Sequence, residues 1–223
     1  GKRLRPYTFK CPKPMLTVAG SPILKHIIKN VSDQGFKKIL IATHYLGSMI
    51  RDYFKNGKNF GIEIDYLNEN KPMGTAGALS LIKKIPNDPF LIINGDVLTN
   101  IDFGELIDYH EKNSSDATMA VKFFDLKNPY GVVRTKGNKI VGFEEKPVQK
   151  SIIINAGVYV INPKTIKFLK RRKIDMPDFF KIIKKKKRKT IVFPIHENWY
   201  EIGNFQDYDP VKKIKRKNFI WKK

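Results

Sequence analysis

Residues 23–42, ILKHIIKNVSDQGFKKILIA, contain the pattern that decides the fold class. In their first half, apolar residues recur three and four positions apart, which predicts an amphipathic helix that ends at Gly35. The apolar run ILIA at residues 39–42 follows within a few positions and is typical of a buried strand. A helix that leads at once into a fully apolar strand is characteristic of α/β proteins, in which helices cover both faces of a sheet.

The same alternation of helix and strand continues along most of the chain. It predicts further helices at residues 46–54, 75–84 and 103–113 and strands at residues 62–66, 90–94 and 117–121. We therefore predict a Rossmann-like, doubly wound α/β fold with a mostly parallel sheet.

The rhythm changes at about residue 130. Short strand patterns follow at residues 131–134, 140–143 and 153–160, and we interpret them as a small antiparallel insertion or lid. The remaining patterns predict a strand at residues 191–193 and helices near residues 164–170, 176–187 and 204–213. Since the sequence shows no internal repeat and no flexible linker, we expect one domain over residues 1–211 and a basic tail over residues 212–223.

The composition limits the classes to which this chain of 223 residues can belong. Its hydrophobic content of 41% supplies a core and excludes a mostly disordered chain. The single cysteine, Cys11, excludes an intramolecular disulfide framework and a zinc site built from cysteines. It also fits a reducing compartment, so we expect a cytoplasmic location. The longest apolar runs are far shorter than the roughly 20 residues that cross a bilayer, and we expect no membrane insertion.

The net charge of +22 lies mostly in the C-terminal part of the chain. Residues 164–223 contain 20 of the 43 basic residues and 6 of the 21 acidic ones. Two runs, residues 184–189 and 212–223, carry this excess, and we interpret them as a solvated helix face and a tail. No regularly spaced aromatic residues accompany the first run, so nucleic acid is at most a secondary partner.

Two acidic residues stand where a parallel sheet binds its ligands, which is beyond the carboxyl ends of the strands. Asp96 directly follows the strand pattern at residues 90–94. A carboxylate there either holds a hard cation with phosphate oxygens or ends the strand and caps the next turn. Glu201 lies between apolar neighbours at the end of a short strand. A buried carboxylate at this position needs a partner or a metal, whereas a solvent-facing one does not.

Basic and small residues in loops are the other candidates. Arg3 and Lys13 stand on loops shaped by glycine and proline, which either bind a polyphosphate or are ordinary loops. The small residues 74–77, GTAG, let a flat ring approach the backbone, or they only allow tight packing. Glu145 and Lys146 either bind sugar hydroxyls and a phosphate or form an ordinary surface ion pair. The histidines lack the spacing of a metal site, and we expect structural roles for His26, His44, His110 and His196.

The order of the motifs resembles that of the sugar-phosphate nucleotidyltransferase family from residue 1 to about residue 211. The motifs are G-x-R-L-R-P-x-T (1–8), P-K-P-M (12–15), P-M-G-T-A-G-A-L (72–79), N-G-D (94–96), P-Y-G-V-V (129–133), E-E-K-P (144–147), N-A-G-V-Y-V-I (155–161) and W-x-E-I-G (199–203). Later matches, D-M-P-D at 175–178 and F-P-I-H-E at 193–197, are most similar to bacterial guanylyltransferases that act on mannose-, glucosamine- or heptose-1-phosphate, including those of surface-glycan pathways.

This resemblance implies a reaction and a set of site residues. An oxygen of the sugar-1-phosphate attacks the α-phosphate of a nucleoside triphosphate in line and expels pyrophosphate, so catalysis comes from positioning and charge neutralisation. Arg3 would stabilise charge on the α-phosphate and the departing pyrophosphate, and Lys13 would hold phosphates of both substrates. The resemblance also assigns Mg²⁺ to Asp96 and Glu201, the nucleotide to Gly1, Pro72, Gly74 and Thr75, and the sugar phosphate to a small antiparallel insertion and to Gly131, Glu145, Lys146 and Asn155.

Two departures from the family pattern lead to further expectations. Glu201 stands where the family usually has aspartate, which lengthens the reach to a metal by one methylene. The family's glycine-rich loop begins one strand earlier, and Gly1 matches its last glycine. We therefore expect an N-terminally truncated chain that lacks the first, central strand and is poorly active. The small residues 74–77 suit guanosine, uridine, cytidine or thymidine nucleotides, and the similarity to guanylyltransferases favours GTP.

Three other functions are compatible with parts of the sequence. A catalytically silent homologue would sense nucleotide sugars or scaffold a partner subunit, and Glu201 favours it weakly. Arg3, Lys13, Asp96 and Lys146 argue against it, because a silent copy has no chemical need for them. A metal-dependent glycosyltransferase typically has two acidic residues separated by one, whereas residues 96–98 contain one. Nucleic-acid binding through the C-terminus would weaken steeply with salt.

Overall fold

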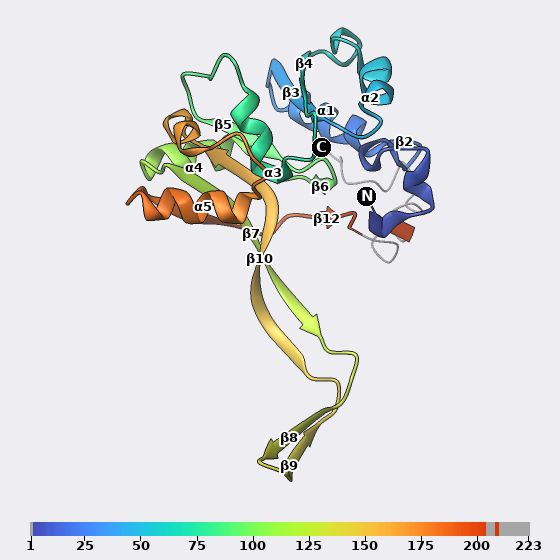
Figure 1. Ribbon diagram of the computed structural model, residues 1–223, viewed down its shortest axis with the longest axis vertical. Helices are drawn as coiled ribbons and strands as arrows, with labels where there is room; N and C mark the ends of the chain where they lie inside the picture. The colour runs from blue at the N-terminus through green and yellow to red at the C-terminus, as the bar shows by residue number, and fades with distance from the viewer. Residues whose placement is uncertain (1, 204–207, 210–223) are drawn as a thin grey trace.

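The computed structural model describes residues 2–203, 208 and 209 (Figure 1). Its α-helices are α1 (Ile23–Asp33), α2 (Gly47–Phe54), α3 (Gly74–Gly77), α4 (Phe103–Lys112) and α5 (Met176–Lys185). Its strands are β1 (Thr17–Val18), β2 (Ser21–Pro22), β3 (Lys38–Thr43), β4 (Glu63–Asn68), β5 (Phe90–Ile93), β6 (Val97–Thr99), β7 (Ala117–Lys127), β8 (Val132–Lys136), β9 (Lys139–Glu144), β10 (Val148–Ile161), β11 (Thr190–Ile195) and β12 (Trp199–Glu201). Short 3-10 turns are η1 (Lys2–Leu4), η2 (Tyr7–Phe9), η3 (Lys13–Met15), η4 (Lys58–Phe60), η5 (Ala78–Leu81) and η6 (Pro163–Phe168).

Most strands of the four-stranded sheet point in one direction, as the mostly parallel sheet predicted from the sequence requires. β3 and β4 pair in parallel. The four-stranded sheet has the order β11-β7-β10-β5, in which β11 is parallel to β7 and β10 is antiparallel to both β7 and β5. β5, β7 and β11 therefore point the same way, and β10 runs against them.

Helices cover both faces of the four-stranded sheet. Leu91 and Ile93 of β5 pack into the apolar cluster to which α1 and α4 belong, whereas Phe90 and Ile92 pack into the cluster of α5. Successive side chains of a strand point to opposite faces, so α4 and α5 lie on opposite sides of the sheet. This arrangement confirms the doubly wound fold.

The helix predicted at the start of residues 23–42 forms as expected. α1 buries the apolar residues that the spacing selects, which are Ile23, Leu24, Ile27, Ile28 and Val31. Gly35 follows with φ +89°, a left-handed conformation that glycine adopts without strain. Its N–H donates to the Ser32 carbonyl oxygen at 3.0 Å, and β3 begins three residues later.

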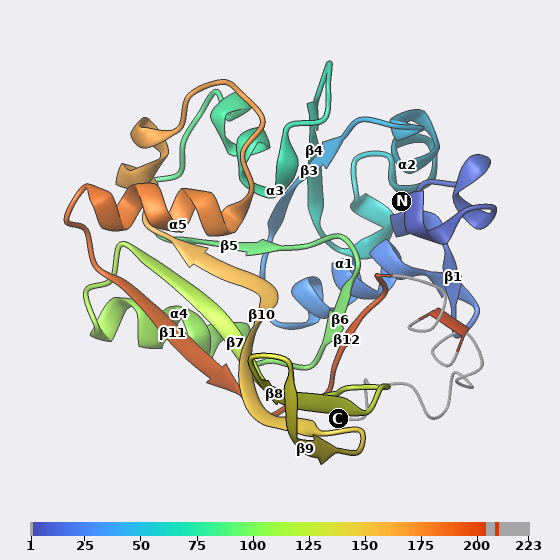
Figure 2. The same cartoon turned by 60° about the horizontal axis from the view of Figure 1, so that its bottom comes forward.

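The antiparallel insertion forms an arm that projects from the body of the molecule (Figure 1). β7 and β10 extend well beyond the predicted residues 117–121 and 153–160, and the hairpin β8–β9 lies at their far end. β11 stops pairing with β7 at Lys122, and β5 pairs only with residues 158–161 of β10. The arm, defined here as residues 123–153, is therefore two strands wide; Figure 2 shows it from its tip.

Two short strands, in a sheet of their own, bring the C-terminal motif beside the residues that follow β5. β12 pairs antiparallel with β6, a strand that the apolar pattern does not predict. Within the described part of the chain, β3 pairs only with β4 and β5 only with β10, so each has one unpaired edge. The predicted helix at residues 204–213, apart from residues 208 and 209, and the basic tail lie outside the described residues.

Candidate functional site

Lys13 and Asp96 meet at the carboxyl end of β5. The turn Asn94-Gly95-Asp96 leads from β5 directly into β6. Nζ of Lys13, at the start of η3, donates a hydrogen bond to Oδ2 of Asp96. The two side chains are 16% and 21% exposed, so water and salt screen this ion pair less than a surface pair. A cation and a carboxylate are thus held together where an open α/β sheet binds its ligands.

Glu201 lies on the strand next to Asp96. In the pairing of β12 with β6, Glu201 is opposite Val97, and the N–H of Ile202 donates to the Asp96 carbonyl oxygen at 3.0 Å. Over the described residues, no third histidine, cysteine or acidic residue joins these carboxylates in a metal cluster. Mg²⁺ is commonly held by one or two carboxylates together with water and substrate phosphates. Asp96 and Glu201 offer the type of oxygen ligand that this ion prefers, and their backbones lie on neighbouring strands.

Gly157 fixes the turn that carries Asp96. The N–H of Asn94 donates to the Gly157 carbonyl oxygen at 2.8 Å. Gly157 has φ +70°, and a Cβ atom there would lie 2.8 Å from Nδ2 of Asn94 and 2.9 Å from Cγ2 of Val97. Side chains do not approach one another so closely, so this contact requires glycine. The N-G-D and N-A-G motifs thus form one packing unit.

Two hydrogen bonds orient the Asn155 side chain, which stands two residues before Gly157. Its Nδ2 donates to the hydroxyl oxygen of Tyr159 at 2.7 Å, and its Oδ1 accepts from the N–H of Gly157 at 3.0 Å. Trp199 of β12 donates from Nε1 to the carbonyl oxygen of Ala156 at 2.8 Å, which ties β12 to β10. The amide of Asn155 is thereby held at the edge of the site.

Tyr159 lies beneath this amide and is 1% exposed. Burial raises the pKa of Tyr159, the hydrogen bond from Asn155 lowers it, and the negative charges of Glu201, Asp96 and Asp175 raise it. The phenol therefore stays neutral.

The loop before α3 is tied to residues 172–176 through the backbone. The N–H groups of Ala76 and Gly77 donate to the carbonyl oxygen of Ile174 at 3.0 and 3.1 Å. The N–H of Ile174 donates in turn to the carbonyl oxygen of Met73 at 2.9 Å. These contacts shorten the predicted helix at residues 75–84: only Gly74–Gly77 is α-helical, and a 3-10 turn follows.

Side chains continue the same contact. Oδ1 of Asp175 accepts from the N–H of Thr75 at 3.0 Å, and the Thr75 hydroxyl oxygen accepts from the N–H of Met176 at 2.8 Å. Gly74 has φ +76°, and a Cβ atom there would lie 2.5 Å from the Ile174 carbonyl oxygen. Gly74, the neighbouring Pro72 and Thr75 leave their outer side open to solvent or a ligand, since Pro72 and Thr75 are exposed.

Arg3 is the N-terminal candidate that the structure describes. Arg3 is exposed on η1, which the fully buried Leu4 anchors to the core. The other nucleotide candidate at this end, Gly1, lies outside the described residues.

The structure does not bring three predicted sugar-phosphate residues to Asp96. Gly131, Glu145 and Lys146 lie together on the arm, where Nζ of Lys146 is 3.8 Å from Oε1 of Glu145 and a Cβ atom on Gly131 would lie 3.1 Å from Oε2 of Glu145. Figure 1 shows this end of the arm far from α3 and β6. Of the four predicted residues, only Asn155 belongs to the body.

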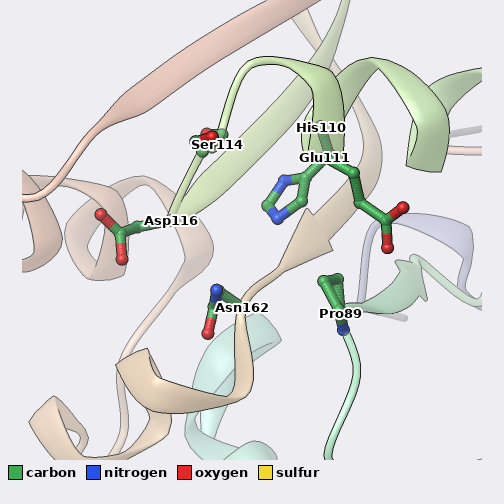
Figure 3. Close-up of a pocket in the computed structure, with 7 residues that line it drawn as sticks. Pro89, His110, Glu111, Ser114, Asp116 and Asn162 are labelled. Carbon is green, nitrogen blue, oxygen red and sulfur yellow. The ribbon is translucent and has the colours of Figure 1, made fainter.

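A separate pocket of about 240 Å³ lies at the end of α4 (Figure 3). His110, Glu111, Asp116 and Asn162 line it together with Pro89, Ser114 and Ser115. His110 is 1% exposed, and its Nδ1 is 2.8 Å from the hydroxyl oxygen of Thr118. Burial lowers the pKa of His110. The role of this histidine in the core agrees with the structural role predicted for it.

Sequence reasoning missed Asp175, Tyr159 and Trp199 as residues that support the site. Asp175 belongs to the D-M-P-D match and Tyr159 to N-A-G-V-Y-V-I, but neither pattern shows which backbone or side chain the residue will meet. Thr75 and Asp175 are 100 positions apart in the chain, and only the fold brings them together.

Comparisons with known proteins agree with this architecture. The family model described as nucleotidyl transferase matches residues 1–217. Mannose-1-phosphate guanyltransferase of Yarrowia lipolytica is 31% identical over 217 residues, which are 93% of this chain and 59% of that protein. Mannose-1-phosphate guanylyltransferase of Mycobacterium tuberculosis is 34% identical over 172 residues, which are 74% of this chain and 47% of that protein. The chain therefore belongs to the sugar-phosphate nucleotidyltransferases of the nucleotidyl transferase family.

A solved structure shows the same fold. HddC from Yersinia pseudotuberculosis superposes with a TM-score of 0.71 at 24% identity, over 95% of this chain and 93% of that one. The chain spans about three fifths of the length of the first curated relatives, 59% for the Yarrowia protein. No helix among the described residues is long and apolar enough to cross a membrane.

Proposed function

We propose that this protein transfers a guanylyl group from GTP to a sugar-1-phosphate and releases pyrophosphate, with Mg²⁺ as cofactor. The observation that carries the proposal is the pairing of Lys13 with Asp96 at the carboxyl end of β5, beside Glu201. The names of the relatives support guanosine as the base and mannose-1-phosphate as the first sugar phosphate to test. The product would be a sugar donor for surface-glycan assembly, made in the cytoplasm.

The bond changes balance without a nucleophile from the protein. A phosphate oxygen of the sugar-1-phosphate forms a bond to the α-phosphorus of GTP, and the bond from that phosphorus to the oxygen bridging to the β-phosphate breaks. Pyrophosphate leaves with the electron pair of that bond. The attacking group is already an anion, so the protein has to align two polyanions and neutralise their charge.

The basic residues of the site perform this neutralisation. Lys13 moves its ammonium from Asp96 to the phosphates as they arrive, because its side chain is flexible. Arg3 is exposed and precedes Lys13 in the chain. Its guanidinium group contacts the α-phosphate and the leaving pyrophosphate. When bound by Asp96 and Glu201, Mg²⁺ supplies further charge neutralisation at the phosphates.

The binding loops hold the two substrates in place. The base of the nucleotide lies against Pro72, Gly74 and Thr75, where small residues and the contact with residues 172–176 give a rigid platform. Asn155 donates to the sugar phosphate from the body. Gly131, Glu145 and Lys146 join Asn155 at the sugar phosphate when the arm approaches the body.

Pyrophosphate release tests this proposal. Four nucleoside triphosphates are crossed with mannose-, glucosamine-, glucose- and heptose-1-phosphate in the presence of Mg²⁺. We expect release with GTP and one sugar-1-phosphate, and none when either is omitted.

The matched variants are Asp96→Asn and Asp65→Asn. Asp65 pairs with Lys38 on the surface of β4, so its variant removes the same charge outside the site. Release should disappear with Asp96→Asn only. A folded protein that binds a nucleotide sugar but releases no pyrophosphate with any pair would contradict the proposal and indicate the catalytically silent homologue.

A further inference from the structure

The pocket at the end of α4 lies at the edge of the sheet opposite the candidate site. Pro89, which lines it, directly precedes β5, and Asp116, which also lines it, directly precedes β7. Asp96 follows β5 at the other end of that strand. β5 therefore runs from this pocket to the candidate site. None of the residues that line the pocket belongs to the candidate site.

His110 lines this pocket, and one of its ring nitrogens has no hydrogen-bond partner among the described residues. The residue is 1% exposed, and its Nε2 is a buried atom without a partner. Buried polar atoms in folded proteins are nearly always paired with another protein group, a ligand or an ordered water. The pocket into which Figure 3 shows the ring of His110 projecting is therefore where a partner of Nε2 binds.

The hydrogen bond to Thr118 decides which nitrogen of His110 carries the proton. Burial lowers the pKa of His110, so the imidazole is neutral and one nitrogen holds the proton. The Thr118 hydroxyl is buried, and among the described residues it bonds only to Nδ1, at 2.8 Å. A proton on Nδ1 would leave both the hydroxyl proton and Nε2 unpaired, whereas a proton on Nε2 leaves only that N–H group unpaired. His110 therefore presents an N–H donor to the pocket.

Asn162 and Asp116 add a second donor and an acceptor. Oδ1 of Asn162 accepts from the N–H of Lys164 at 3.1 Å, so Nδ2 is left to donate, and Figure 3 shows it turned towards His110. Oδ2 of Asp116 accepts from the N–H of Lys189 at 3.0 Å. Its Oδ1 accepts no hydrogen bond from the described part of the chain, so it is open to a donor in the pocket.

This set of groups suits a neutral ligand with several hydroxyl groups. An anion would meet the negative charges of Asp116 and Glu111, and a cation would face the N–H groups of His110 and Asn162. A hydroxyl group donates and accepts at once, so it can pair with both kinds of group. The volume of about 240 Å³ equals that of about eight water molecules at roughly 30 Å³ each, which leaves room for one sugar ring.

We propose that this pocket is a second binding site, which takes a neutral sugar of one ring. Hydroxyl groups of the sugar accept from Nε2 of His110 and Nδ2 of Asn162, and they donate to the carboxylates of Asp116 and Glu111. Pro89 offers an apolar surface to the C–H groups of the ring. No lysine or arginine lines the pocket, so the sugar binds without a phosphate, in contrast to the substrate of the proposed reaction.

Magnetic resonance of the full chain, with its histidines labelled with nitrogen-15, tests the site. The probes are D-mannose and D-glucose, with inorganic phosphate and choline as the anionic and cationic comparisons. We expect at least one sugar to shift the Nε2–H signal of His110 in a saturable way, and phosphate and choline to leave it unchanged. The free sugars lack the phosphate that attacks GTP, so this readout does not depend on pyrophosphate release, and the site is tested separately from the proposed reaction.

Two pocket variants and two controls locate the bound sugar. Asn162→Asp keeps an oxygen to accept from the Lys164 N–H but removes the donor, and it should weaken binding about tenfold. Glu111→Gln changes an exposed carboxylate of the pocket and should weaken binding about threefold. Glu105→Gln removes the same charge near the start of α4, and Asp96→Asn alters the candidate site. Both controls should bind the sugar like the wild type.

The remaining outcomes would overturn the proposal. A His110 signal that neither sugar shifts would mean that ordered water alone pairs with Nε2. A shift caused by phosphate or choline and not by the sugars would contradict the ligand class, and a proton found on Nδ1 would contradict the assigned donor. A sugar that binds both pocket variants as tightly as the wild type, but is lost in Asp96→Asn, would lie in the candidate site.

Discussion

At Gly74, one added methyl group should weaken nucleotide binding as well as the stability of the fold. In Gly74→Ala the new Cβ atom would lie 2.5 Å from the Ile174 carbonyl oxygen and 2.6 Å from Oδ1 of Asp175. The loop and residues 172–176 must then move apart, and overpacking of this kind costs about 1–3 kcal/mol. The left-handed φ of +76° adds about 1–2 kcal/mol for a residue with a side chain.

Gly35→Ala is the matched control for this substitution. Gly35 has φ +89°, but a Cβ atom there meets nothing within 4 Å. The control therefore carries the cost of the backbone conformation without the clash. Both variants should lose stability in chemical denaturation, with the larger loss in Gly74→Ala.

Nucleotide affinity gives the decisive comparison, measured by calorimetric titration with GTP. If about 2 kcal/mol of the free-energy cost of the substitution weakens GTP binding, the affinity of Gly74→Ala for GTP drops roughly 30-fold. Gly35→Ala should bind GTP like the wild type. The reasoning would be refuted by a Gly74→Ala protein that binds GTP normally, or by equal losses in both variants.

Three further predictions follow from contacts around the site and the core. Gly157→Ala should lower the free energy of unfolding by about 2 kcal/mol in chemical denaturation, because its Cβ atom would meet Asn94 and Val97. Tyr159→Phe removes the acceptor of the Asn155 amide, so the KM for the sugar-1-phosphate should rise about fivefold while that for GTP is unchanged in steady-state assays; equal changes in both would contradict this role. Burial lowers the pKa of His110 in the folded protein, so this histidine binds a proton more tightly in the unfolded chain. The free energy of unfolding should therefore fall as the pH drops from about 7.5 to about 5.5, through the ordinary pKa of histidine. Denaturation at both pH values should show a smaller fall for His110→Gln than for the wild type.

The fold class could be predicted because it depends on patterns within short stretches. The spacing of apolar residues in α1 reflects burial on one side of the helix. The apolar run at residues 39–42 correctly marks the strand β3, but the prediction that this strand is buried is wrong for Leu40 and Ala42, which are exposed. The arm could not be predicted in full by the same reasoning. Its strands expose both faces, so polar and apolar residues do not alternate in a way that marks one buried face.

The site was predictable to the extent that sheet topology and motif order determine it. Ligands of parallel sheets bind beyond the carboxyl ends of the strands, so the position of Asp96 after β5 made it a candidate. Lys13, which is 83 positions away in the chain, pairs with it. Asp175 was not predictable, because its hydrogen bond to Thr75 arises from tertiary packing. The same packing limits α3 to four residues, although small residues and apolar spacing predicted a longer helix.

The fate of labelled phosphates tests the central claim most directly. GTP labelled at the α-phosphate is incubated with mannose-1-phosphate, Mg²⁺ and the protein, and the products are separated. We expect the label in a nucleotide sugar, formed in amounts equal to the pyrophosphate released, and a loss of at least about a hundredfold in Asp96→Asn. Label recovered as GMP or GDP without a nucleotide sugar, or an Asp96→Asn protein as fast as the wild type, would contradict the account.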